Sequence, residues 1–76
     1  MRQSELVAAA AIRAELLSGD ARRARVASGV SAAEVARIVG VSRATVSDWE
    51  SGRKSPTGGH ALAYGRLLAA LARRAA

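Results

Sequence analysis

Four glycines, Gly19, Gly29, Gly40 and Gly52, divide the chain into short segments, and each follows a stretch of helix-forming residues. Glycine readily adopts the left-handed conformation in which many helices end, so this spacing predicts a series of short helices. Alanine, the best helix former, is abundant, whereas β-branched residues are too scattered to form strands. We therefore expect an all-α fold, a compact bundle of about five short helices.

Length and residue types exclude several classes of protein. A chain of 76 residues can bury one small core, so it forms one domain. It has no cysteine and a single histidine, His60, which excludes disulfides, thiolate metal sites and a catalytic Cys-His pair. Without paired carboxylates on one helix face or a glycine-rich phosphate loop, we expect no enzyme activity, metal, cofactor or small-molecule substrate. No segment resembles a signal peptide or a membrane span, which predicts a cytoplasmic protein without a membrane partner.

The charge balance indicates a polyanionic partner. Twelve Lys and Arg residues face six Asp and Glu residues, for a formal net charge of +6. Charge alone is also compatible with acidic proteins and membrane surfaces. All the basic residues except Lys54 are arginines, whose planar guanidinium matches phosphates and guanine edges. Nucleic acid is therefore the favoured partner.

Capping and loop residues predict where the outer helices begin and end. The first helix is expected over residues 4–17 with Ser4 as its N-cap, and the second over residues 20–28, capped by the Asp20 carboxylate. Proline and glycines in residues 53–59 predict a polar, basic loop, and a last helix follows over about residues 60–74. The first helix carries Leu6, Ile12, Leu16 and Leu17 among alanines.

Two further short helices are predicted in the middle of the chain. Ser31 and Glu34 form a capping box, in which the hydroxyl of one and the carboxylate of the other each accept a backbone N–H. Ser42 has the position of an N-cap for the next helix, and Gly40 forms the corner between the two. Apolar residues on one side of both helices can pack together: Val35, Ala36, Val39, Val41, Val46 and Trp49.

This pattern resembles the helix-turn-helix of the Cro and repressor proteins of temperate phages and of the wider xenobiotic-response-element regulator family. The similarity extends from about residue 21 to about residue 71 and includes the run VSRATVSDWESGRKSP at residues 41–56. It implies a lambda-repressor-like DNA-binding domain over residues 19–76, preceded by an extra N-terminal helix over residues 1–18. The pair Gly58 and Gly59 departs from the family pattern, and the fifth helix of many members would need residues beyond Ala76.

The resemblance also implies roles for individual residues. Family geometry places the helix Ser42-Ser51 in the major groove of double-stranded DNA, with its N-terminal residues against base edges. The implied base-reading residues are Arg43, Ala44, Thr45, Ser47 and Asp48. The implied phosphate contacts are Ser31, Ala32, Ser42, Arg53, Lys54 and Ser55. Phosphate contacts set the register of a protein on DNA, and base contacts set its sequence preference.

The chemistry of these side chains fits the implied roles unequally. Arg43 can donate two parallel hydrogen bonds to guanine O6 and N7, and the Ala44 methyl can contact a thymine methyl. For Arg43 the alternative is a solvated surface charge. Asp48 can accept from a cytosine amino group, but it can equally repel phosphate or pair with a nearby arginine.

Four more residues have expected positions. Arg25 and Glu50 match an ion pair that several phage repressors hold between their first helix and the end of the recognition helix, with two unrelated surface charges as the alternative. Trp49 is expected in the core, because its spacing from Val46 points it inward. His60, beside two glycines, is expected at the surface.

The leading hypothesis is a transcriptional repressor that binds a near-palindromic DNA operator as a homodimer. The alternative is an antitoxin that autoregulates its operon and binds a partner toxin. A protein-interaction module without a DNA site is the third hypothesis. The N-terminal helix either covers apolar surface of its own subunit or packs against a second subunit.

Overall fold

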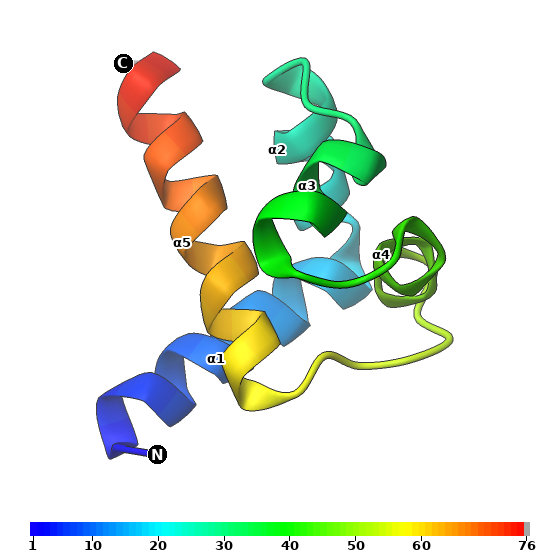
Figure 1. Ribbon diagram of the computed structural model, residues 1–76. Helices are drawn as coiled ribbons and strands as arrows, with labels where there is room; N and C mark the ends of the chain where they lie inside the picture. The colour runs from blue at the N-terminus through cyan, green and yellow to red at the C-terminus, as the bar shows by residue number, and fades with distance from the viewer. Residues whose placement is uncertain (76) are drawn as a thin grey trace.

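The computed structural model describes residues 1–75, which form five α-helices joined by short connections (Figure 1). The helices are α1 (Gln3–Ser18), α2 (Asp20–Ala27), α3 (Ala32–Val39), α4 (Arg43–Glu50) and α5 (Gly58–Ala75). With no strand in the described part of the chain, they confirm the predicted all-α fold. Ala76, the last residue of the expected DNA-binding domain, lies outside the described residues. None of the five described helices is long and apolar enough to cross a membrane.

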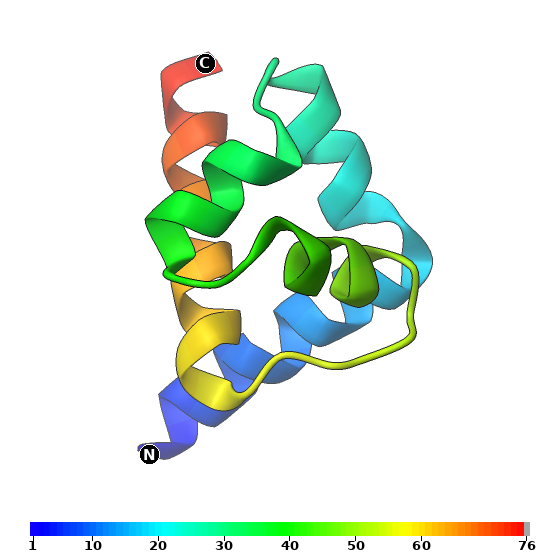
Figure 2. The same cartoon turned by 45° about the vertical axis from the view of Figure 1, so that its right-hand side comes forward.

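The longest helix, α5, runs along one side of the molecule, and the other helices pack beside it (Figures 1 and 2). α1 crosses the beginning of α5 and also contacts α2 and α4. α3 packs against both α4 and α5. α4 lies at the edge of the bundle, so one of its sides faces the other helices and the opposite side is open (Figure 1).

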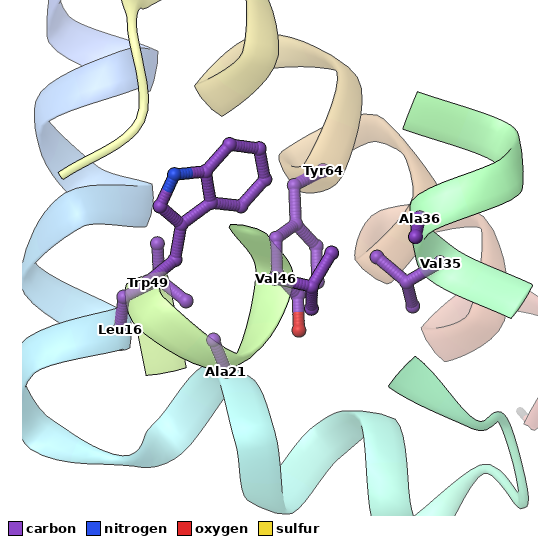
Figure 3. Packing of buried hydrophobic residues seen from close by; sticks show 7 residues of the cluster. All are labelled: Leu16, Ala21, Val35, Ala36, Val46, Trp49 and Tyr64. Atoms are coloured by element: carbon purple, nitrogen blue, oxygen red, sulfur yellow. The ribbon is translucent and has the colours of Figure 1, made fainter. Parts of the chain in front are cut away.

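One core joins all five helices. Its buried side chains are Leu16, Ala21, Val35, Ala36, Val46, Trp49 and Tyr64 (Figure 3). A smaller cluster of Ala9, Ile12 and Ala61 connects α1 to α5, and Leu68 packs against both clusters. α1 therefore contributes to the same core as the helices that follow it.

Only one stripe of α1 is buried. Ala9, Ile12 and Leu16 recur at three- and four-residue steps and are almost inaccessible to solvent. Leu6 and Leu17 lie on another side of this helix and are 55% and 77% exposed. Of the five large apolar residues of α1, Ile12 and Leu16 therefore pack in the core, whereas Leu6, Val7 and Leu17 face outward.

The first two helices begin differently from the prediction. Ser4 is not an N-cap but lies within the first turn of α1, because the Glu5 carboxylate accepts the backbone N–H of residue 2 at 3.0 Å. Asp20 is likewise the first residue of α2 and not its cap. Its carboxylate pairs with Arg23 one turn later, and its own N–H donates to the Ser18 hydroxyl at 3.3 Å.

The last helix begins two residues earlier than predicted. Gly58 and Gly59 belong to its first turn and not to the preceding loop, and the Ala61 N–H donates to the Thr57 carbonyl at 2.8 Å. The low helix propensity of glycine is overcome here by packing, since Ala61 and Tyr64 are both fully buried.

Candidate nucleic-acid interface

A tight turn at Gly40, Val41 and Ser42 joins α3 to α4. Gly40 has a φ of 88°, a left-handed conformation that costs residues with a side chain roughly 1–2 kcal/mol. The backbone N–H groups of Gly40 and Val41 both donate to the Ala36 carbonyl, at 2.8 and 2.9 Å. The turn therefore fixes where α4 begins relative to α3.

The start of α3 has the reciprocal cap that was expected. The Ser31 N–H donates to the Glu34 carboxylate at 2.9 Å, and the Glu34 N–H donates to the Ser31 hydroxyl at 3.1 Å. These hydrogen bonds hold the pKa of Glu34 below its usual value. The Ser31 N–H is thus occupied. The backbone N–H groups of Ala32 and Ala33 have no acceptor within the helix, because they belong to its first turn.

Ser42 caps α4 and also engages Thr45. Its hydroxyl oxygen accepts the Thr45 N–H at 3.1 Å, and the two hydroxyl oxygens lie 2.8 Å apart. Thr45 is half-buried and its hydroxyl is already hydrogen-bonded within the protein. The backbone N–H groups of Arg43 and Ala44 have no intrahelical acceptor and face out of the start of α4.

The two sides of α4 have different tasks. Val46 and Trp49 point into the core, where Trp49 lies beside Leu16 and Tyr64 (Figure 3). The side chains that face solvent are those of Arg43, Ala44 and Ser47. Three of the five expected base-reading residues therefore lie on the open side of the helix.

Asp48, an expected base-reading residue, forms ion pairs with two of the expected phosphate contacts. Its carboxylate oxygens are 3.6 Å from a guanidinium nitrogen of Arg53 and 3.9 Å from the Lys54 ammonium, and its side chain is 23% exposed. Both cations are mostly exposed, as is Ser55 in the same loop. In the free protein Asp48 thus offsets the charge of two expected phosphate contacts.

Arg25 and Glu50 form a buried ion pair that ties α4 to α2. The Arg25 guanidinium donates to both Glu50 carboxylate oxygens at 2.8 Å, and donates to the Val30 carbonyl at 2.9 Å. The side chains of the pair are only 10% and 6% exposed. Tyr64 of α5 donates its hydroxyl to Glu50 at 2.5 Å, so the end of α4 is fixed to two other helices.

The partners in this network determine one another's protonation. Burial alone would raise the pKa of Glu50, but hydrogen bonds from Arg25 and Tyr64, with the positive charge of Arg25, hold that pKa below its usual value. The hydrogen bond to Glu50 raises the pKa of Arg25. Burial and the hydrogen bond to Glu50 raise the pKa of Tyr64. At neutral pH the network therefore contains a carboxylate, a guanidinium and a neutral phenol.

Sequence reasoning missed two residues around this network. Tyr64 was given no role, although a buried tyrosine hydroxyl normally requires a hydrogen-bond partner, which was the available signal. Arg22 was given no role, yet it lines a cleft of about 300 Å³ with Arg53, Ser47 and Ser51 on the open side of α4. Arg22 adds a further cation beside this surface to Arg43, Arg53 and Lys54. Because Arg22 belongs to a different helix, the sequence did not show that it lies close to this surface.

His60 is half-buried and not a surface residue. Its ring lies against that of Trp49, with ring centroids 5.7 Å apart, because the first turn of α5 lies beside the end of α4. Among residues 1–75, no three His, Cys, Asp or Glu side chains come together in a way that could hold a metal ion.

Comparison with known proteins identifies one family. The model of a helix-turn-helix family matches residues 22–72, well over half of the chain. The match covers Arg25, both helices around the Gly40 turn, the loop after α4 and most of α5, and it leaves α1 outside. No curated protein and no solved structure shows significant similarity to the chain.

Proposed function

Because the chain belongs to the helix-turn-helix family of DNA-binding transcription regulators, of the Cro and repressor type, we propose that it represses transcription by binding a specific site in double-stranded DNA. In this proposal residues 42–51, which comprise α4 and its two caps, lie in the major groove of the operator. A protein bound there blocks transcription by excluding the polymerase.

The division of α4 into two faces carries the proposal. Val46 and Trp49 are buried by the fold, whereas Arg43, Ala44 and Ser47 are exposed. Within the described residues, the side chains of these three make no hydrogen bond or ion pair. They are therefore available to a ligand at no cost to the core.

The available side chains match base edges. Arg43 can donate to guanine O6 and N7, the Ala44 methyl can pack on a thymine methyl, and the Ser47 hydroxyl can donate or accept. Thr45 takes part through its methyl or by rotating its hydroxyl away from the N-cap. Asp48 accepts from a cytosine amino group only where Arg53 and Lys54 turn to phosphates.

The proposed phosphate contacts surround this helix. The free amides at the start of α3, beside Ser31 and Ala32, favour an anion, because a helix N-terminus carries partial positive charge. Ser42 offers a hydroxyl at the start of α4. Residues 53–55 complete the set, with the exposed Arg53 and Lys54 and the backbone at Ser55.

We infer a homodimer on a near-palindromic site, because one copy of the chain can recognise only a few base pairs. One helix with a few base-reading side chains specifies too few base pairs to stand out among roughly 10⁶ or more competing sites. Two copies related by a two-fold axis would place their α4 helices about 34 Å apart, and half-site centres about 10 base pairs apart.

Selection of bound fragments from random duplex DNA tests the proposal, because the selected site reveals both sequence preference and symmetry. Arg43→Ala should relax the preference at one base pair of each half-site, a loss of about 1–3 kcal/mol of discrimination. Lys54→Ala should weaken binding to all sequences alike and lower the salt slope by about one phosphate's worth. Equal effects of the two variants on every sequence would contradict the proposal.

One observation favours the antitoxin alternative. A groove of about 640 Å³ lies between α1, α2 and α5. Alanine is the commonest of its lining residues, and none of these residues belongs to α3 or α4. A partner protein seated there would leave the proposed DNA surface open. Co-expression with the product of the neighbouring gene distinguishes the two functions, since only an antitoxin would form a stable complex and neutralise that product.

A further inference from the structure

A contact between α1 and the loop after α4 reaches outside the segment that matches the family. The Arg13 Nε–H donates to the Pro56 carbonyl at 3.1 Å, across 43 positions of sequence. Arg13 is half-buried and Pro56 is buried. The carbonyl belongs to residues 52–57, the loop that carries Arg53 and Lys54.

This loop is fastened to the end of α4 only in its first half. The Gly52 N–H donates to the Trp49 carbonyl at 3.3 Å, and the Lys54 N–H donates to the Asp48 carbonyl at 3.2 Å. The Leu17 side chain of α1 also lies beside this half, since a methyl group added to Gly52 would be 3.8 Å from it. Beyond residue 54, the proline has no N–H to donate, so its carbonyl is its only backbone hydrogen-bonding group.

We propose that α1 positions the DNA-contacting loop and that Arg13 is the positioning residue. Its guanidinium holds the loop at Pro56, so that Arg53 and Lys54 are presented to the phosphates in a fixed geometry. A hydrogen bond from a charged donor is stronger than a neutral one, which suits it to this task. The inference rests on the proposed DNA-binding function and gives the extra N-terminal helix a role in it.

The consequence for binding is a change in the population of the ordered loop. If the loop is in its binding-competent arrangement for only a fraction of the time, the apparent affinity falls by that fraction. Loss of a hydrogen bond with a charged partner is enough to shift such an equilibrium by about tenfold. Arg13 would thus affect DNA affinity without touching DNA.

Arg13→Gln in the full chain tests this, with Arg66→Gln as the matched control. Each variant removes one positive charge. Arg66 is exposed on α5, where it lines the groove between α1, α2 and α5, away from the proposed DNA surface on α3 and α4. We expect the dissociation constant for the selected operator to rise about tenfold for Arg13→Gln and by less than about twofold for Arg66→Gln. Equal losses in the two variants would overturn the proposal.

Hydrogen exchange provides a readout that does not depend on DNA. In Arg13→Gln the Lys54 amide should exchange several-fold faster, while the amide of the core residue Tyr64 and the melting temperature stay close to those of the parent. Unchanged exchange at Lys54, or faster exchange throughout the core, would overturn a local positioning role. If the parent protein fails to bind duplex DNA, the proposed function fails, and faster exchange at Lys54 still supports the contact itself.

A multiple-mutant comparison separates positioning from direct contact. In a chain that already carries Arg53→Ala and Lys54→Ala, Arg13→Gln should weaken DNA binding by less than about twofold, because it acts through side chains that are gone. A further tenfold loss in that background would mean that Arg13 acts independently of the loop, and the proposal would be wrong.

Discussion

Replacing Glu50 by alanine should be among the most damaging single changes outside the apolar core. Among residues 1–75, the substitution leaves the Arg25 guanidinium, only 10% exposed, with the Val30 carbonyl as its one remaining hydrogen-bond acceptor. It also removes the acceptor of the Tyr64 hydroxyl. The variant therefore buries an uncompensated charge and an unpaired hydroxyl together.

The expected loss follows from that burial. Breaking a buried ion pair by removing one partner costs about 3–5 kcal/mol, whereas an exposed pair is worth about 1 kcal/mol or less. A domain of this size has roughly 4–11 kcal/mol of unfolding free energy in total. The melting temperature should therefore fall by at least about 12 °C, at about 4–8 °C per kcal/mol.

Thermal and urea melts measure this loss, and Glu15→Ala is the matched control. Glu15 is an exposed glutamate of α1, and its replacement should change the unfolding free energy by about 0.5 kcal/mol or less. Arg25→Ala and the double variant complete a cycle, in which the double variant should lose far less than the sum of the two single losses. A loss of only about 1 kcal/mol in Glu50→Ala, or additive losses in the cycle, would refute the reasoning.

Four further outcomes are expected. Folding lowers the pKa of Glu50, so the stability that this carboxylate contributes should be complete above about pH 4.3 and should disappear as the pH falls through the pKa of the folded state. In urea melts between pH 7 and 2, Glu50→Gln should therefore lose less unfolding free energy on acidification than the parent protein. Tyr64→Phe should cost about 1.5–3 kcal/mol in the same melts, since it removes a hydrogen bond to a charged group. Gly40→Ala should cost roughly 1–2 kcal/mol, purely from its backbone conformation, because among the described residues no heavy atom outside residues 39–41 lies within 4 Å of the added methyl. Deletion of residues 1–18 should abolish cooperative unfolding, observed by circular dichroism, because Leu16 belongs to the main core.

Several features that depend only on neighbouring residues could be predicted from the sequence, although the expected caps at Ser4 and Asp20 were wrong. The capping box of Ser31 and Glu34, the Ser42 cap and the Gly40 corner each need only a short stretch of chain, and the structure has all three. The inward direction of Trp49 follows from helical periodicity in the same way. Together these features define the pair of central helices.

Features that depend on how helices cross could not be predicted. Two hydrogen bonds join distant segments, one from Tyr64 to Glu50 and one from Arg13 to Pro56. No local sequence pattern identifies either pair of partners. Asp48 could be assigned to a base or to an arginine with equal justification, because its ion pairs depend on how the following loop folds back. The start of α5 was mispredicted for a related reason, since tertiary packing decides whether two glycines join a helix.

The open side of α4 also has a consequence for how such a protein changes over time. Arg43, Ala44 and Ser47 support neither the core nor the buried ion pair, so surface substitutions there should alter stability by about 0.5 kcal/mol or less. If these three positions read bases as proposed, substitutions there can adapt the protein to a new operator without compensating mutations in the scaffold. Randomising only these positions, and keeping everything that faces inward, should then retarget the protein in the laboratory.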